Sequence, residues 1–212
     1  MFKPIKWNTF VRDMLRIQLG FAMFGVSIAM LIRANLGTSA WAVLEVAVAQ
    51  ITHLTPGTIS VGMGFLVLIF AMLLREEIGW GTLANIVCIG PFEDLSLWLI
   101  PSVKDNVLIQ TGMLLAAIVI MGLACAVYIG VDACAGPRDS LMLAIERSTG
   151  WSVRISRGVL EVSVVVVGWL LGGPAGAGTL VFAVLIGPAV QASFKLLSVR
   201  PHRPLDTEVE DG

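Results

Sequence analysis

The sequence predicts an all-α protein, a polytopic bundle of transmembrane helices built from two tandem repeats. Of its 212 residues, 57% are hydrophobic and only 14% are charged, whereas a soluble domain averages about 25% charged residues. Several apolar runs are long enough to cross the ~30 Å hydrocarbon core of a bilayer. A stretch around Gly90 recurs 97 positions later around Gly187, which indicates an internal duplication.

The duplication is clearest in residues 79–91, which recur as residues 176–188 and end in the same Ile-Gly-Pro triplet. In lipid, a Gly-Pro pair in mid-helix frees backbone groups, so such a break has to face protein or water. Matched breaks in two halves point to the central site of a transporter. The alternative is a kink that serves packing alone. We expect structural breaks at Gly90, Pro91, Gly187 and Pro188.

The two repeats divide into matching segments. Repeat 1, about residues 17–101, has a long span at 17–33, a short segment at 40–52, a long span at 57–74 and a broken span at 79–100. Repeat 2, about residues 107–198, has the same order at 107–130, 138–149, 154–171 and 178–198. Residues 17–198 thus form one membrane domain, between a basic tail at 1–16 and a polar tail at 199–212 that we expect to be disordered. The run 17–33 has a duplicate, so we interpret it as a retained span and not as a signal peptide.

The short segments decide the topology. Segment 40–52 reaches only ~20 Å at 1.5 Å per residue, so we expect two re-entrant or half-helices, six spans and inverted repeats. Eight spans with parallel repeats is the alternative. With the N-terminus inside, six spans leave 12 of the 14 basic residues inside, and eight spans leave 11. The positive-inside rule therefore does not separate the two topologies, and both place the N- and C-termini in the cytoplasm.

Both halves contain distinctive stretches. In the first half they are residues 32–37, Trp41, Gly81-Thr82 and Ile89-Gly90-Pro91; in the second half they are residues 136–139, Val153-Arg154, Glu161, residues 168–173 and Gly187-Pro188. Together these stretches resemble the bacterial YczE-like integral membrane proteins, which are related to the YitT group. The family pattern has an acidic residue after the tryptophan, where this chain has Ala42, with Asp139 as its repeat counterpart. The resemblance implies a protein of the bacterial cytoplasmic membrane and no particular mechanism.

The first candidate for a functional side chain is Asp94, three residues past Pro91. A charge near the bilayer centre costs roughly 2.5–3.5 kcal/mol on insertion scales, so such residues are functional candidates. The alternative places it at the interface, with the segment ending at Pro91. We prefer Asp94 to its neighbour Glu93, because the repeat counterpart of Asp94 is the polar Gln191. Asp94 and Gln191 are thus candidate substrate-binding residues.

Four further candidates follow from position. Arg138 and Asp139 open a short segment, where a helix dipole favours anions, although Asp139 alone can complement that dipole. Glu161 stands four residues after Arg157, so a local ion pair competes with a place in a polar pathway. Asn85 fits either an interhelical hydrogen bond or the site. We predict that Asp94, Gln191, Arg138 and Asp139 converge as a polar centre.

Several function classes lack support in the sequence. We find no HExxH, GxSxG or GxGD motif, and the two histidines are far apart, so we expect no enzyme, no metal site and no cofactor. A net charge of −1 gives no reason to expect a nucleic-acid partner. The expected surroundings are a lipid bilayer, the expected ligand is a small polar or anionic solute, and a homo-oligomer is left open. We expect a small transporter or channel-like protein with its site between the repeats; a membrane-embedded accessory or regulatory protein of a larger complex is the alternative.

Overall fold

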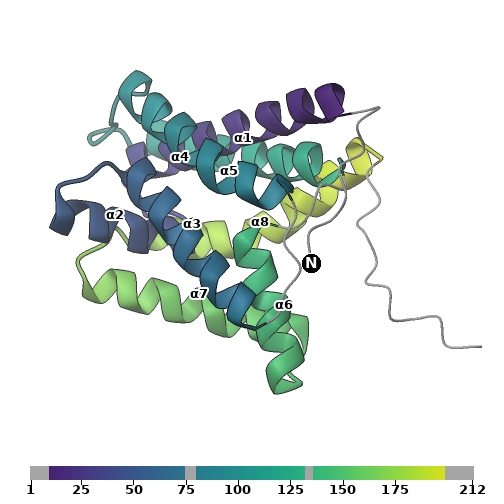
Figure 1. The fold of residues 1–212 in the computed structure, drawn as a ribbon. Helices are drawn as coiled ribbons and strands as arrows, with labels where there is room; N and C mark the ends of the chain where they lie inside the picture. The colour runs from purple at the N-terminus through teal and green to yellow at the C-terminus, as the bar shows by residue number, and fades with distance from the viewer. Residues whose placement is uncertain (1–9, 75–79, 132–135, 199–212) are drawn as a thin grey trace, which may run out of the picture.

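The computed structural model describes residues 10–74, 80–131 and 136–198, and in these ranges all regular structure is α-helical (Figure 1). The helices are α1 (Phe10–Arg33), α2 (Ala40–Thr52), α3 (Pro56–Leu73), α4 (Trp80–Leu99), α5 (Val107–Ile129), α6 (Pro137–Thr149), α7 (Val153–Leu170) and α8 (Ala177–Leu196). The all-α fold class is confirmed. α1 already begins at Phe10, so part of the predicted basic tail is helical.

The helices of the second half recur in register with those of the first. Each of α5 to α8 begins 97 residues after its counterpart among α1 to α4. The short helices both end at a left-handed residue, His53 after α2 and Gly150 after α6. The next helices both begin after a capping hydroxyl residue, Thr55 before α3 and Ser152 before α7. Each of these hydroxyls accepts a hydrogen bond from a backbone N–H in the first turn of its helix. Superposition of the two halves in space stays a prediction.

Contacts between α1 and α4 define the two ends of the bundle. The rings of Phe10 and Trp80, at the starts of these helices, have centroids 5.3 Å apart. Near their ends, the Arg33 guanidinium donates a hydrogen bond to the carbonyl of Leu97. α1 and α4 are therefore parallel. We call the two ends of the bundle the Trp80 end and the Arg33 end.

α5 runs in the opposite direction to its counterpart α1. The Ser27 hydroxyl, in the middle of α1, donates to the Ala117 carbonyl of α5 at 2.7 Å. Gly20, closer to the Trp80 end, packs on Tyr128, near the end of α5. The contacts move backwards along α5 as they move forwards along α1, so the two helices are antiparallel. An inverted duplication requires this relation.

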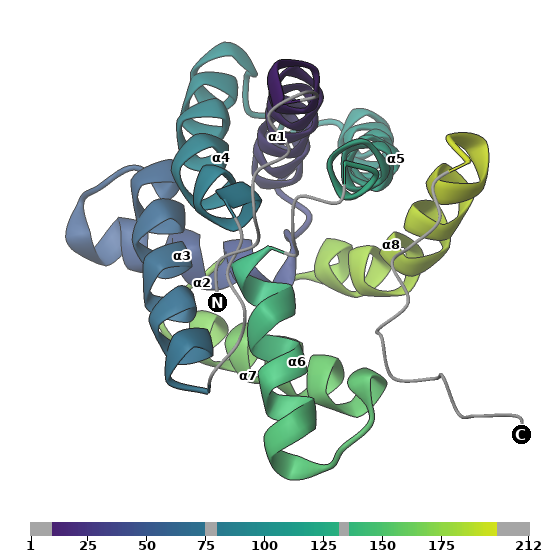
Figure 2. The same cartoon turned by 45° about the vertical axis from the view of Figure 1, so that its right-hand side comes forward.

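α8 likewise runs opposite to α4. It packs along α5, and it begins at the Arg33 end, where the Gly178 N–H donates to the Leu36 carbonyl at 2.7 Å. The halves also exchange contacts through their short helices, because α2 packs on α7 and α6 packs on α3. One pairing is not repeated: α3 packs along α4, but no comparable packing joins α7 to α8 in the described ranges. Figure 2 shows α8 reaching away from α6 and α7.

The short helices do not run the length of the bundle. α2 and α6 have 13 residues each, or ~20 Å. Just before α2, the Thr38 N–H donates to the Thr179 hydroxyl at the start of α8. Just after α2, the Gly57 N–H at the start of α3 donates to Asp94, in the part of α4 toward the Arg33 end. Both ends of α2 therefore lie in the same half of the bundle.

The long helices carry the hydrophobic surface of a membrane protein. α1, α3, α5 and α8 are each long and apolar enough to cross a bilayer. The core lies mainly between α1, α4 and α5 and includes Phe21, Ile28, Leu31, Leu114 and Ile118. Large aliphatic side chains such as Leu115, Val119, Leu180 and Val184 are exposed on the outer faces. Such surfaces suit lipid contact, because lipid tails are as apolar as these side chains and exposing the side chains to them costs little.

The predicted breaks at Gly90-Pro91 and Gly187-Pro188 are not breaks, which corrects the expectation from the sequence. α4 continues as a helix through Pro91 to Leu99, and α8 continues through Pro188. Proline removes only one backbone donor, and a membrane helix tolerates this when its neighbours satisfy the freed carbonyl. Figure 2 shows α8 changing direction along its length, and the helix is continuous through Pro188.

Candidate functional site

The two short helices meet head to head in the middle of the molecule. Trp41 is the second residue of α2, and Arg138 is the second residue of α6, 97 positions later. The Arg138 guanidinium lies over the Trp41 ring, 4.8 Å from its centroid, which is a favourable cation–π geometry. The two equivalent positions of the duplication thus touch each other. The centre of the site is therefore built by both halves.

Arg138 also forms a buried ion pair with Glu45 of α2. The pair joins Arg138 Nη2 to Glu45 Oε1, and the Glu45 side chain is 1% exposed against 28% for Arg138. The Ser60 hydroxyl of α3 donates to the same Glu45 oxygen at 3.3 Å. Three helices thereby supply one polar cluster. A buried pair of this kind is costly to desolvate and holds together only with good geometry and further hydrogen bonds.

Glu93 of α4 adds a second buried carboxylate to this cluster. It is 0% exposed, and neither of its oxygens has a hydrogen-bond partner within the described residues. It lies within electrostatic range of Glu45 and Arg138. Its backbone packs directly against Gly25 of α1, where a larger residue would collide with α4. Glu93 is therefore held in the interior between helices and is not free to turn toward the surface.

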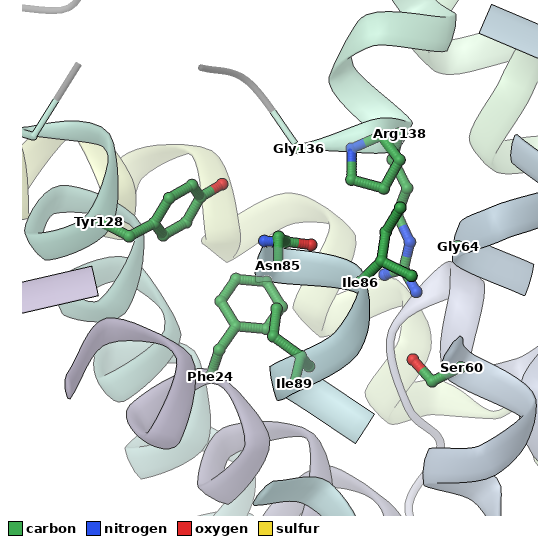
Figure 3. A pocket seen from close by; sticks show the side chains of 10 residues that line it. Phe24, Ser60, Gly64, Asn85, Ile86, Ile89, Tyr128, Gly136 and Arg138 are labelled. Atoms are coloured by element: carbon green, nitrogen blue, oxygen red, sulfur yellow. The ribbon is translucent and has the colours of Figure 1, made fainter. Parts of the chain in front are cut away.

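A small cavity of about 60 Å³ extends from Arg138 toward the Trp80 end. Figure 3 shows the phenol of Tyr128, the amide of Asn85 and the guanidinium of Arg138 around it. Its other lining residues are Phe24, Ser60, Gly64, Ile86, Ile89, Gly136 and Pro137. A water molecule needs ~10–15 Å³ of such volume and two to four polar partners. The cavity is thus large enough for a few water molecules and polar enough to hold them.

Asp94 does not face this centre, contrary to the preference stated for it over Glu93. It is only partly buried, and it binds the start of α3. Its carboxylate accepts the Thr55 hydroxyl at 2.6 Å and the Gly57 N–H at 2.9 Å. A negative charge at a helix N-terminus is stabilised by the free N–H groups and the helix dipole. The position of Asp94 is thus fully explained by capping.

The structure does not bring Asp94, Gln191, Arg138 and Asp139 together as predicted. Of these four, Arg138 lies in the central cluster. Gln191 is exposed on α8, because α8 does not pack on α7 as α4 packs on α3. The side chain of Asp139 lies outside the described residues. Whether any of the candidates binds a substrate stays a prediction.

The remaining two candidates, Glu161 and Asn85, differ in whether they lie near the central cluster. Glu161 pairs with Arg157 one turn earlier on α7, with Nε and Oε1 at 2.9 Å and side chains 36% and 56% exposed. Of the two alternatives for Glu161 in the sequence analysis, the structure shows the local ion pair and not a place in a polar pathway. Asn85 lines the cavity that leads to Arg138. Asn85 therefore keeps its place in the candidate site, whereas Glu161 lies outside it.

Two members of the cluster, Glu45 and Ser60, were not among the candidates. The only signal for Glu45 was an acidic residue in the otherwise apolar segment 40–52. Its partner is 93 residues away in the chain, so no local spacing pointed to the pair. Within the described residues, no group of three or more His, Cys, Asp or Glu side chains is placed to hold a metal ion.

The comparisons with known proteins agree with a membrane protein. Residues 11–195 match the family described as "Family of unknown function (DUF6198)". The chain is 35% identical over 170 residues to the "Uncharacterized membrane protein YczE" of Bacillus subtilis, covering 77% of this chain and 76% of that protein. It is 29% identical over 202 residues to an "Uncharacterized protein" of Haemophilus influenzae, covering 94% and 91%. No solved structure matches the chain. The chain therefore belongs to this family of YczE-like integral membrane proteins.

Proposed function

We propose that the protein is a small transporter or channel-like protein of the bacterial cytoplasmic membrane, with both termini in the cytoplasm and with its site between the two halves. The observation that carries the proposal is the buried cluster of Glu45, Arg138 and Glu93 where the short helices meet. Ionisable groups at this depth are expensive and are functional candidates by default. The proposal includes no chemical reaction and no cofactor.

The construction of the centre supports this role. Secondary transporters bind solutes at the interface of inverted repeats, where half-helices point their N-termini at the site. Here α2 and α6 begin at the centre, each with its second residue in contact with the other helix. Their N-terminal N–H groups favour a small polar or anionic solute. The cavity places room for a few water molecules beside this point, next to Arg138.

One observation favours a second candidate function, an accessory role in a larger membrane complex. α8 is the least buried of the candidate spans, at 22% against 39–44% for the others. Within the described residues, its extensive packing against another long helix is with α5. Its free faces suit lipid, and they equally suit the helices of another membrane protein.

Uptake by proteoliposomes tests the first function against the second. The full chain is reconstituted and tested with small polar and anionic solutes one at a time. We expect uptake of at least one solute, and we expect its loss in the double variant Glu45→Gln, Arg138→Gln, which removes both charges and strands neither. The exposed pair on α7 provides the matched control, Arg157→Gln with Glu161→Gln, which should transport normally.

Two results would contradict the transporter. The first is folded wild-type protein that takes up none of the solutes. The second is uptake that survives in the double variant of the central pair. Purification of the wild type as a stoichiometric complex with another membrane protein, together with the first result, would favour the accessory role.

A further inference from the structure

We infer that Glu93 is a proton-binding site at the centre of the protein, so that the solute movement proposed above is coupled to protons. The inference rests on the proposed function and names its coupling ion. Binding is a simple protonation, in which a Glu93 carboxylate oxygen and a proton form a neutral carboxyl group.

The charges of the cluster do not balance without an added cation. Glu45 and Glu93 contribute two carboxylates, and Arg138 contributes one guanidinium. Of the other charged groups near Glu93, Asp94 is held at the start of α3, and Arg33 of α1 binds the Leu97 carbonyl toward the Arg33 end. Nothing titratable from α3 faces Glu93 within the described residues. One unpaired negative charge in the interior is costly, so one positive charge has to accompany it.

The hydrogen bonds indicate that the added positive charge is a proton on Glu93. Glu45 already accepts Arg138 and the Ser60 hydroxyl through one oxygen. Neither oxygen of Glu93 accepts anything from the described residues. An ionised carboxylate needs donors in the interior, whereas a neutral carboxyl group leaves far less to be satisfied. The carboxylate without donors is therefore the one that carries the proton.

The surroundings of Glu93 fit a proton better than a metal cation. Sodium and potassium ions need a shell of several oxygen ligands with room between them, as the hard divalent cations do. Glu93 does not line the cavity, and its backbone is pressed against Gly25 of α1. A proton needs no such room. The position of Glu93 thus selects the smallest cation.

The cavity provides an access route for the proton. It ends at Arg138 and Ile89, and Ile89 lies one helical turn before Glu93 on α4. Water in the cavity can carry a proton from the Trp80 end to this point, because Tyr128 and Asn85 line the way with polar groups. When Arg138 turns from Glu45 toward Glu93, Glu93 becomes the paired anion and its proton moves to Glu45, so that one carboxylate stays neutral and the charges still balance. The exchange of Arg138 between two carboxylates would couple solute and proton.

Infrared difference spectroscopy of the full chain in proteoliposomes tests the inference directly. The carbonyl stretch of a protonated carboxyl group is distinct from carboxylate bands and shifts in D2O. We expect one such band in wild-type protein near neutral pH, lost in Glu93→Gln and displaced in Glu93→Asp. Asp94→Asn is the matched control on the adjacent residue and should keep the band.

A further variant tests whether Glu93 is protonated because of the charge balance of the cluster or only because it is buried. In Glu45→Gln, Arg138 has Glu93 as its only remaining carboxylate, so Glu93 should ionise and the band should disappear. Absence of a Glu93 band at every pH at which the protein stays folded would overturn the inference. So would a band that persists in Glu45→Gln, or one that sodium chloride removes at constant pH, which assigns the site to a metal cation.

The spectrum does not depend on solute uptake, so the two proposals fail separately. A Glu93 band in a protein that transports nothing removes the transporter and leaves the proton site. Solute uptake that is indifferent to a pH gradient, in a protein without the band, removes the proton site and leaves the transporter.

Discussion

At the scale of single residues, two ion pairs of the same chemistry have very different surroundings. Arg138 and Glu45 join two helices in the interior, with the carboxylate 1% exposed. Arg157 and Glu161 lie one turn apart on α7, with side chains 56% and 36% exposed. Removing one member of a buried pair leaves an uncompensated charge, whereas an exposed pair contributes little. This contrast allows a matched test of the central pair.

We expect Arg138→Gln to lower the free energy of unfolding by about 3–5 kcal/mol, because Glu45 is left buried without its partner. Arg157→Gln should cost less than about 1 kcal/mol. The double variant of the central pair should recover much of the loss, since no charge is stranded. Unfolding curves in mixed micelles measure all three. Equal losses in Arg138→Gln and Arg157→Gln would show that the central pair is not buried in the protein.

The capping role of Asp94 leads to a second prediction. Asp94→Ala should destabilise the protein by about 1 kcal/mol, because two donors at the start of α3 lose their acceptor. Asp94→Asn should cost less, since the amide oxygen still accepts. Solute uptake should survive in Asp94→Asn. Its abolition in well-folded protein would return Asp94 to the site, where the sequence placed it.

The sequence drew attention to the acidic neighbours Glu93 and Asp94, but the one that it favoured, Asp94, is not the one that is buried in the central cluster. Successive residues on a helix point about 100° apart, so Glu93 and Asp94 cannot both face the centre. The choice rested on the repeat counterpart of Asp94, Gln191. That counterpart is exposed because α8 and α4 pack differently. Which face of α4 is inward depends on α1 and α3, and no local pattern encodes their packing.

At the scale of helices, the two halves differ in one close helix crossing, which is present only in the first half. Gly57 of α3 and Gly90 of α4 lie in direct contact, and a Cβ on either would collide with the carbonyl oxygen of the other. The counterparts of Gly57 and Gly64 on α7 are Arg154 and Glu161. Small residues let helix backbones approach, and large charged ones do not. This difference explains why α4 packs on α3 while α8 does not pack on α7.

We expect Gly90→Ala to destabilise the protein by about 1–3 kcal/mol, because α3 and α4 have to move apart. Its repeat counterpart is the control. A Cβ at Gly187 would meet nothing within 4 Å, so Gly187→Ala should be neutral or stabilise by up to about 1 kcal/mol through helix propensity. Thermal unfolding in detergent compares the two. Similar losses at both positions would mean that α8 packs as closely as α4.

Apart from the start of α1, which lies seven residues before the predicted one, helix positions were predictable to within two residues, for reasons that are local. Apolar length, the Thr55 and Ser152 caps and the glycine after α6 mark starts and ends directly. The continuity of α4 and α8 through proline was not predictable in this way. It depends on whether neighbouring helices satisfy the freed backbone groups, which is a property of packing.

At the scale of the whole molecule, the direction of the helices bears on the topology that charge counting left open. α1 and α5 are antiparallel, and both ends of α2 lie toward the Arg33 end. In an eight-span protein α2 would cross, and the equivalent helices α1 and α5 would be parallel. The contacts thus favour six spans with inverted halves. The positions of the connecting loops across the membrane stay a prediction.

The loop between α4 and α5 distinguishes the two topologies. With six spans it lies outside the cell, and with eight it lies inside, while both place the termini in the cytoplasm. Lys104 is exposed in this loop, and the three native cysteines can be removed first. In intact cells, we expect Lys104→Cys to react with a membrane-impermeant maleimide. Asn8→Cys and Glu208→Cys should react only after the membrane is opened, because basic residues flank both termini. Protection of position 104 together with both termini would establish eight spans, and α2 would then have to cross the bilayer with only 13 residues, less than the ~17 that a spanning helix needs.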